Sequence, residues 1–462
     1  MMDIDASFDA IIVGAGQAGP SLAGKLTAAG WTVAFVERKL FGGTCVNVGC
    51  TPTKALVASA KTAFVVRRAK DFGVVVGGNV GVDMRAVKAR KDAIVAKSRD
   101  GIESWLRGMK GCTVFVGAAR FEGPGKMRVG DKLIGAKKFF LNVGARPSLP
   151  ASLGADKVKH LTSSTILDLD VLPEHLVVVG GSYIGLEFGQ MYRRFGSRVT
   201  VVERGSRLIA HEDEEFSAAV KTMLEAEGIQ IRLNANCIHL EQEGENVCVH
   251  VACEEGEPSV LGTHTLLAIG REPNTGDLGL ETIGVAQDER GYIVVDDELK
   301  TSVEGVWALG ECNGRGAFTH TSYNDFEIVA ANLLTDEKRK VTDRYPVHGL
   351  FIDPPLAHVG MTEAEVRKTG RPALVGARPM TKVGRAVEKG ETWGSMKVLV
   401  DAESRKILGA TIFGVGGDEA IHSILAAMYA KETADFMTHS MYIHPTVAEL
   451  IPTVFGDLKP LV

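Results

Sequence analysis

Two cysteines, Cys45 and Cys50, lie in the segment GGTCVNVGCTPTK with four residues between them, where a helix is expected to begin at Pro52. Thiols at this spacing close a disulfide only if the turn between them is tight, and Gly49 makes such a backbone feasible. Helix N-terminal amides and the nearby Lys54 would lower the pKa of a thiol, as a reversible dithiol requires. The pattern indicates redox chemistry, with two inert buried cysteines as the alternative.

A nucleotide-binding pattern precedes this pair. A strand over 8–13 (FDAIIV) enters GAGQAG, a helix follows to residue 29, and a strand over 32–36 ends in an acid. In the dinucleotide fingerprint, glycines let the backbone approach a pyrophosphate, and the acid accepts a hydrogen bond from a ribose hydroxyl. Gly14, Gly16, Gly19 and Glu37 are therefore expected to bind a dinucleotide.

The same pattern recurs in the middle of the chain. A strand over 176–179 enters GGSYIG, a helix covers 187–195, and a strand over 199–202 ends in Glu203. The acid follows the first glycine by 23 residues in both units (37 − 14 and 203 − 180). Two units predict two dinucleotide sites, unless the second is a plain βαβ core. Glu203 favours NADH because a carboxylate repels a 2′-phosphate, whereas Arg204 and Arg207 leave NADPH open.

Composition excludes several classes of protein. The 462 residues predict about three domains. A net charge of −5 makes nucleic acid and anionic membrane surfaces poor partners, and no apolar run approaches the ~18 residues of a membrane span. Asp3, Asp5 and Asp9 replace the positive charge of a signal peptide. Seven scattered cysteines form no disulfide scaffold or zinc spacing, so a reducing cytoplasm and no metal site are expected.

The region after residue 343 is expected to form a third, α+β unit. Thr362 and Glu365 have the spacing of a capping box at the start of a helix. Strands are expected over 396–401 and 407–414. Apolar residues at helical spacing predict one helix over 418–437.

The cysteine segment resembles the active-site segment of the FAD-dependent pyridine nucleotide–disulfide oxidoreductases (class I). The resemblance covers essentially the whole chain: AIGREPNT (268–275) is similar to the family's joining segment, TSVEGVWALGECNG (301–314) to its second FAD motif, and IHPTVAE (443–449) to its carboxy-terminal catalytic segment. It implies an α/β fold with two Rossmann-like domains and a dimerisation domain. The implied boundaries are 1–150 and 270–342 for FAD, 151–269 for NAD(P), and 343–462 for the α+β dimerisation domain.

The resemblance also implies roles for individual residues. Cys50 would face the flavin, and Cys45 would be the interchange thiol that attacks substrate. His444, oriented by Glu449, would act as general acid–base from the other subunit of a homodimer. Lys54 and Glu187 would pair near flavin N5, and Tyr183 would gate the nicotinamide pocket. The cofactor-binding residues implied are Gly14, Gly16, Gly19, Glu37, Gly43, Thr44, Lys54, Gly144, Gly310, Glu311, Gly180, Gly181, Tyr183, Ile184, Glu203, Arg204, Gly270 and Arg271.

Two departures from the family pattern bear on its use. Glu311 stands where the family usually has Asp at the flavin ribityl chain, so a shifted hydrogen bond is expected. Ser182 replaces the middle glycine of the second unit, which is a small steric change. The five cysteines outside the pair are expected to be structural or incidental.

The resemblance implies electron flow from NAD(P)H through FAD to the Cys45–Cys50 disulfide and then to an oxidised small molecule. Mercuric reductases carry an additional cysteine pair near the carboxy terminus, but no cysteine follows Cys312 here. Glutathione reductases typically have Lys where Thr53 lies. The sequence most resembles the mercuric-reductase-like branch of the family, which implies a disulfide, thiol-linked or metal acceptor. Alternatives are a dihydrolipoamide dehydrogenase, a reactive-chlorine-resistance flavoprotein, a redox sensor or docking subunit, and an oxidase.

Overall fold

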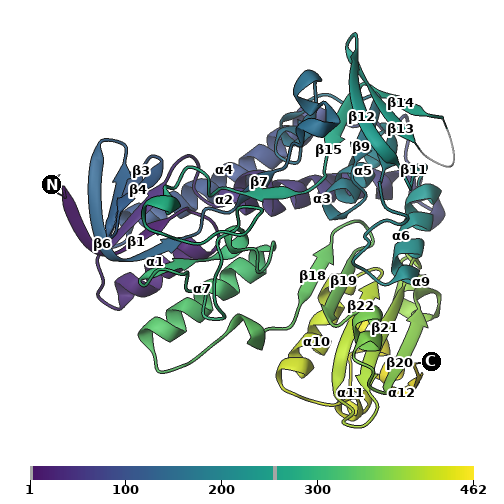
Figure 1. Ribbon diagram of the computed structural model, residues 1–462. Helices are drawn as coiled ribbons and strands as arrows, with labels where there is room; N and C mark the ends of the chain where they lie inside the picture. The colour runs from purple at the N-terminus through teal and green to yellow at the C-terminus, as the bar shows by residue number, and fades with distance from the viewer. Residues whose placement is uncertain (1–3, 253–256, 462) are drawn as a thin grey trace.

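The structure is a computed structural model that describes residues 4–252 and 257–461 (Figure 1). Its first sheet has a parallel core, in which β1 lies between β2 and β6, and antiparallel strands complete one edge. The α/β fold class is confirmed. The strands are β1 (Ala6–Val13), β2 (Val33–Glu37), β3 (Cys112–Val116), β4 (Ala119–Gly123), β5 (Lys126–Val129), β6 (Lys132–Leu141) and β17 (Val306–Ala308).

Continuous apolar runs explain this parallel core, because strands covered on both faces are buried throughout. All five residues of β2 are buried, and so is the second half of β1. One face packs against α1 (Ala18–Ala28) and α7 (Thr319–Leu334), where Phe140 stacks on Trp307 with ring centroids 5.1 Å apart. The sheet therefore fixes the loops that follow β1 and β17.

A second parallel sheet has the order β11-β10-β9-β15-β8 and lies at the upper right of Figure 1. An antiparallel sheet of β12, β13 and β14 adjoins it. The strands are β8 (Leu161–Thr162), β9 (His175–Val179), β10 (Arg198–Val202), β11 (Gln230–Arg232), β12 (Asn236–Glu243), β13 (Asn246–Ala252), β14 (Ser259–Gly262) and β15 (His264–Leu267), with helices α5 (Tyr183–Phe195) and α6 (Glu214–Ala226). A two-stranded ribbon, β7 (Ala145–Pro147) with β16 (Arg271–Pro273), joins the two regions.

The carboxy-terminal region folds around an antiparallel sheet of order β18-β19-β22-β21-β20-β23 (Figure 1, lower right). The strands are β18 (Val347–Leu350), β19 (Leu356–Gly360), β20 (Ala373–Pro379), β21 (Ser395–Asp401), β22 (Ile407–Phe413) and β23 (Lys459–Pro460). The helices are α8 (Glu363–Lys368), α9 (Gly384–Glu388), α10 (Gly417–Tyr429), α11 (Ala434–His439) and α12 (Ile451–Gly456). The capping box on α8 is confirmed: the Thr362 hydroxyl accepts from the Glu365 amide, and the Glu365 carboxylate accepts from the Thr362 amide.

The prediction of one helix over 418–437 is wrong. Helix α10 ends at Tyr429 because Lys431 adopts a left-handed backbone with φ of 61°, which interrupts helical hydrogen bonding. Thr433 then caps α11 by accepting a hydrogen bond from the Phe436 amide. The apolar spacing continued through this break, so periodicity alone did not reveal it.

The cysteine segment lies at the start of one of two long helices that cross the middle of the molecule. Helix α3 (Cys50–Arg67) runs beside α4 (Met84–Gly108), and both lead toward α5 (Figure 1). Helix α3 begins at Cys50, two residues before the expected start, and Cys45 belongs to a separate short helix, α2 (Gly43–Val48). Within the described ranges, no helix is long and apolar enough to span a membrane.

Residues 348–353 of the carboxy-terminal region, here called the docking segment, lie against one face of α5. Gln190 accepts from the Asp353 amide at 2.8 Å and donates to the Asp353 carbonyl oxygen at 2.8 Å. Arg194 is 4% exposed and forms ion pairs with Asp353 and with Glu227. Burial alone would raise the pKa of Asp353, but Arg194 and Lys61 outweigh it and hold that pKa below its ordinary value.

Replacing Arg194 is expected to lower the free energy of unfolding. Arg194→Met keeps much of the apolar stem but leaves Glu227 and Asp353 as buried carboxylates without their guanidinium, which costs about 3–5 kcal/mol. Urea denaturation measures the change. Arg198→Met, on an exposed arginine four residues along, is the matched control and is expected to change stability little. Equal stability of the two variants would contradict the assignment of Arg194 as the central cation.

Candidate active site

The two thiols lie at the junction of two helices. Cys45 belongs to α2, and Cys50 is the first residue of α3. Gly49 separates the helices, and a Cβ at this position would meet the Thr44 carbonyl oxygen at 2.8 Å. The tight turn expected between the cysteines therefore needs a residue without a side chain. Both cysteines are free thiols in this structure.

The pKa values of the two thiols are shifted in opposite directions. A hydrogen bond from Cys45 lowers the pKa of Cys50 to about 6, and it outweighs burial, which acts in the other direction. The Thr319 hydroxyl, 3.1 Å from the Cys50 sulfur, and the Lys54 ammonium lower it further. The same shared proton and burial raise the pKa of Cys45. The directions of these shifts favour a thiolate at Cys50, with Cys45 as its hydrogen-bond donor.

Lys54 and Glu187 form an ion pair one helical turn beyond Cys50. Their Nζ and Oε2 atoms are 2.7 Å apart, and the Glu187 side chain is only 8% exposed. The other Glu187 oxygen accepts from the Phe351 amide at 2.9 Å, and the Lys54 ammonium lies 4.5 Å from the Phe351 ring centroid. The docking segment thus holds both members of the pair that the sequence picked out.

Tyr183, the first residue of α5, is anchored by two residues that the sequence analysis did not identify. Its hydroxyl donates to Oε1 of Glu212, and the same oxygen lies 2.6 Å from Nε2 of His348. The rings of Tyr183 and His348 stack with centroids 5.7 Å apart. Burial and the Glu212 charge raise the pKa of Tyr183. Glu212 and His348 come from separate loops and strands, so spacing along the chain carried no signal for them.

The first glycine loop packs tightly on the strand beside it. A Cβ on Gly14 (φ 104°) would lie 2.3 Å from the Asn142 carbonyl oxygen, and one on Gly19 would lie 2.3 Å from the Gly14 carbonyl oxygen. Asn142, at the end of β6, accepts from the Gly19 amide at 3.2 Å. Glu37 accepts from the amides of Ala15 and Lys39, both at 2.8 Å. These contacts fix the loop and its acid relative to each other.

The cysteine segment sits directly on this loop. The Gly42 amide donates to the Ala15 carbonyl oxygen at 2.9 Å, and a Cβ on Gly43 would approach the Gly16 Cα to 2.7 Å. Thr44, which was expected to touch the flavin, is exposed beside Cys45. A group bound along the loop would therefore lie next to the thiols.

The second glycine loop repeats this construction. A Cβ on Gly180 (φ 117°) would meet the Ala268 carbonyl oxygen at 2.3 Å. Glu203 accepts from the amides of Gly181 at 2.6 Å and Gly205 at 2.7 Å. Arg204 is exposed beside it, and Ile184 is partly buried at the start of α5. Each carboxylate oxygen has a second lone pair, so these bonds leave Glu203 able to accept from a ribose hydroxyl.

The segment after β17 forms the opposite wall of the first loop. Asn142 donates to the Leu309 carbonyl oxygen at 2.8 Å, and the Gly310 amide donates to the buried Asp325 at 2.8 Å. Glu311 is paired with Arg271, with Nε and Oε1 2.6 Å apart. Sequence reasoning chose Glu311 and Arg271 separately and did not foresee this pair. Gly144 and Gly270, also chosen, both have positive φ, at 65° and 124°.

His444 and Glu449 form a pair far from the thiols of the same chain. Their Nδ1 and Oε2 atoms are 2.8 Å apart, and the His444 side chain is 82% exposed. Met441 and Ile443, beside it, are 98% and 80% exposed. Figure 1 shows this segment, between α11 and α12, well apart from α2. One chain therefore does not bring His444 to Cys45.

Burial raises the pKa of two cysteines outside the pair, Cys112 and Cys312, and the side chain of Cys237 lies outside the described residues. Cys312 is fully buried, and burial raises its pKa to about 12. Burial also raises the pKa of Cys112, to about 11. Cys253 lies outside the described residues. Among the described residues, no group of three or more His, Cys, Asp or Glu side chains is arranged to hold a metal ion.

The residues present fit a dinucleotide in the first loop. The N-cap residue of α1, Gln17, supplies no side-chain hydrogen bond, and the Gly19 amide is bonded to Asn142, so the bare glycine turn before the helix is the surface that fits a phosphate. Any side chain at Gly14 or Gly19 would collide with backbone, which keeps this surface bare. Glu37 adds a buried carboxylate at the end of β2, where a ribose is recognised in this type of fold.

Comparisons with known proteins agree with this geometry. Residues 8–325 match the family model of the pyridine nucleotide-disulphide oxidoreductases, and residues 348–455 match the dimerisation domain of that family. The chain is 35% identical to the probable pyridine nucleotide-disulfide oxidoreductase RclA of Escherichia coli, covering 98% of this chain and 99% of RclA. It is 31% identical to the mercuric reductase of Streptomyces lividans (98% and 96% covered) and 32% identical to the dihydrolipoyl dehydrogenase of Rhizobium etli (98% and 98% covered).

Solved structures lead to the same family. The HOCl-induced flavoprotein disulfide reductase RclA from Escherichia coli superposes with a TM-score of 0.88 at 33% identity, covering 97% of this chain and 99% of that chain. Its Cu(II) complex gives a TM-score of 0.89 at 32% identity, with 98% and 99% covered. The dimerisation-domain match fits a homodimer. The chain belongs to the pyridine nucleotide–disulfide oxidoreductases, FAD-dependent enzymes that use NAD(P)H.

Proposed function

We propose that this enzyme takes electrons from NAD(P)H and delivers them, through FAD and the Cys45–Cys50 pair, to an oxidised disulfide, thiol-linked or metal acceptor. The observation that carries the proposal is the position of the cysteine pair directly on the first glycine loop, where the Gly42 amide donates to the Ala15 carbonyl oxygen at 2.9 Å, together with a lowered pKa at Cys50 and a raised pKa at Cys45. A dithiol in this form has a stable thiolate and a neighbouring proton donor. Two inert core cysteines would instead both have raised pKa values.

The flavin, when bound, supplies hydride acceptance and a relay of electrons to the disulfide. Gly14, Gly16, Gly19 and Glu37 would hold its adenosine half, and Gly43, Thr44, Gly144, Gly310 and Glu311 its other half. Lys54, held in place by Glu187, would present its ammonium group to the reacting ring. The thiol in contact with the ring would be Cys50, leaving Cys45 to attack the acceptor.

The nicotinamide cofactor would bind the second loop through Gly180, Gly181, Ile184, Glu203 and Arg204, with Gly270 and Arg271 lining the joining segment. Tyr183 would cover the nicotinamide pocket, held by Glu212 and His348. Glu203 favours NADH, because its carboxylate, which is held by the amides of Gly181 and Gly205, would repel the 2′-phosphate of NADPH. The exposed Arg204 keeps NADPH as the second candidate.

His444 would return protons to Cys45 across the subunit interface. Glu449 orients its Nδ1, which leaves Nε2 to face a partner. Because the pair is preformed and exposed, dimerisation would complete the site without rearranging it. The apolar side chains of Met441 and Ile443 beside it would be covered by the same contact.

The similarity to RclA favours an acceptor of the kind that an HOCl-induced flavoprotein disulfide reductase handles. The Cu(II) complex of that protein makes a metal ion a further acceptor or ligand to test. A dihydrolipoyl dehydrogenase is the second candidate, because a relative with that name is 32% identical to this chain and 98% of its length is covered. The predicted cytoplasmic location fits either activity, because a reducing compartment keeps the dithiol open.

The proposed electron path predicts a spectral signature. Anaerobic titration with NADH, and separately with NADPH, should produce a long-wavelength absorption band that is absent in Cys50→Ser. The nicotinamide that reduces the protein better is identified as its cofactor. Turnover with lipoamide and NAD⁺ would favour the dihydrolipoyl dehydrogenase candidate. Complete flavin bleaching after one equivalent without that band would exclude the pair from the electron path.

The acidity of Cys50 can be measured without turnover. In the reduced protein, iodoacetamide labelling of Cys50 should rise with an apparent pKa of about 6, followed by peptide mass mapping. Cys45→Ala removes the hydrogen bond that lowers this pKa most, so labelling should shift to higher pH. Cys45→Ser keeps a donor and should shift less. Identical curves for these two variants would show that Cys45 does not set the acidity of Cys50.

Mixed dimers test the origin of the general acid–base. His444→Gln should lower turnover about 10²–10⁴-fold, the usual contribution of a positioned acid–base group. A dimer of one His444→Gln chain and one Cys45→Ser chain should recover about half of wild-type activity, because one of its two symmetric sites is intact. Inactive mixed dimers would place both residues in one chain and overturn the shared site.

A further inference from the structure

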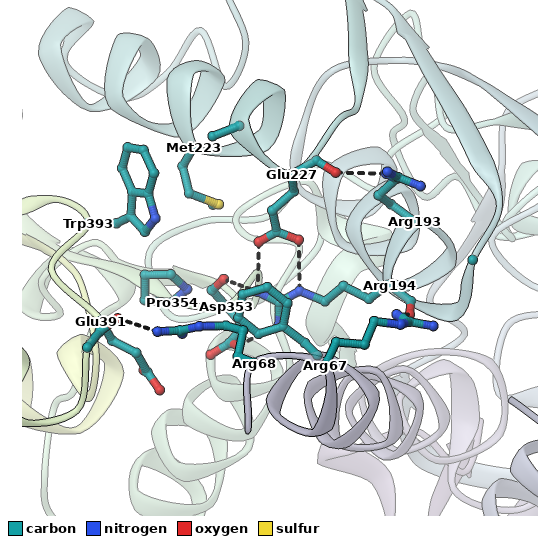
Figure 2. Close-up of a pocket in the computed structure, with 14 residues that line it drawn as sticks. Arg67, Arg68, Arg193, Arg194, Met223, Glu227, Asp353, Pro354, Glu391 and Trp393 are labelled. Atoms are coloured by element: carbon teal, nitrogen blue, oxygen red, sulfur yellow. Dashed lines mark hydrogen bonds and ion pairs between the residues drawn. The ribbon is translucent and has the colours of Figure 1, made fainter. Parts of the chain in front are cut away.

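A basic cavity of about 620 Å³ lies where the ends of α3, α5 and α6 meet the docking segment and residues 390–393 (Figure 2). None of the residues assigned to the thiols or to the two dinucleotide loops lines it. Its volume lies in the range of sites for small organic ligands. It is therefore a separate site, and its lining decides what it can hold.

Two of the three carboxylates that line the cavity are hydrogen-bonded to cations. Glu227 accepts from Arg194 at 2.8 and 2.9 Å through its two oxygens. Asp353 is paired with Arg194 and with Lys61, the latter at 2.8 Å, and Glu391 lies 3.8 Å from Lys61. These three carboxylates share two cations, and the buried Oε2 of Glu391 has no hydrogen-bond partner, so this end of the cavity keeps one negative charge.

Three further arginines are anchored by main-chain carbonyl groups. Arg67 donates to the carbonyl oxygens at the end of α5, Arg68 donates to the Gly390 carbonyl oxygen at 2.8 Å, and Arg193 donates to that of Glu227 at 2.7 Å. A carbonyl group orients a guanidinium but does not cancel its charge. Of these three arginines, only Arg68 has an ion pair in the described part of the chain, with the half-exposed Asp71 at 3.6 Å. The cavity therefore holds a surplus of positively charged groups with fixed directions.

An apolar wall faces the arginines. Figure 2 shows Trp393 and Met223 on one side of the cavity and Arg67 and Arg68 on the other. The Trp393 side chain is 42% exposed, and Pro354 lies below it in the same view. An indole face accepts a flat ring, whereas a guanidinium fork matches the oxygens of a carboxylate, sulfonate or phosphate. The two walls are thus complementary to the two ends of one type of molecule.

We propose that this cavity binds a small aromatic oxyanion, with its ring against Trp393 and its charged group on Arg68. Inorganic anions lack the ring and would use only the arginine wall. Neutral aromatic compounds lack the charge and would use only the apolar wall. The site does not depend on the activity proposed above, because it shares no residue with the thiols or the dinucleotide loops.

Isothermal titration of the FAD-loaded dimer with 2-naphthalenesulfonate tests the proposal, with saturating NAD⁺ present to occupy the nicotinamide site. One site per chain is expected. Arg68→Gln and Trp393→Ala should each weaken binding about tenfold, the loss of one charge-assisted bond or one ring contact. Arg120→Gln, on an exposed arginine of β4, should bind like the wild type. Unchanged flavin absorbance and melting temperature establish that each variant is folded.

Sulfate and 2-naphthol are the matched ligands, and each should bind at least about tenfold more weakly than the sulfonate. Absence of heat with 2-naphthalenesulfonate would overturn the proposal, and so would wild-type affinity in both Arg68→Gln and Trp393→Ala. Sulfate binding as tightly as the sulfonate would show a general anion patch and would overturn the aromatic part.

Discussion

The contact between one face of α5 and the docking segment organises the catalytic half of the molecule. Tyr183, Glu187, Gln190 and Arg194 recur at helical spacing, and each meets a residue of 348–353. Because this face is polar, its buried groups need fixed partners, and the segment supplies them from the carboxy-terminal region. The helix that starts at the second glycine loop is thereby held in register with the Lys54–Glu187 pair. Cofactor loop and thiol helix are positioned by the same contact.

Opposing effects determine the acidity of the thiols. Burial by itself raises the pKa of both, as it does for Cys112 and Cys312. Among these four cysteines, a thiol, a hydroxyl and an ammonium together overcome burial at Cys50 alone. Since these donors come from α2, α3 and the start of α7, the thiolate depends on the packing of three helices. The same sulfur placed in an ordinary core would be protonated and unreactive.

Local features of the site could be predicted from the sequence, and features created by distant contacts could not. Both glycine loops and their terminal acids follow from spacing, because backbone approach and positive φ restrict those positions to glycine. Asn142 holds the first loop from a strand more than a hundred residues away, and Glu212 reaches Tyr183 only in the folded chain. The break near Lys431 was missed because an isolated left-handed residue leaves the apolar period intact.

In the proposed mechanism, the preformed His444–Glu449 pair allows one chain to carry half of a site that its partner completes. The carboxylate of Glu449, which is 17% exposed, orients the imidazole of His444. The His444 side chain is itself 82% exposed, so its direction is fixed although it is not buried. Met441 and Ile443 expose apolar area beside the pair, which is typical of a protein–protein contact surface. A symmetric dimer would bury that area twice and complete two sites at once. Within the proposed mechanism, association of the chains then controls where a reactive thiolate is matched with a proton carrier. An isolated chain would hold Cys50 ready but would lack the group that serves Cys45.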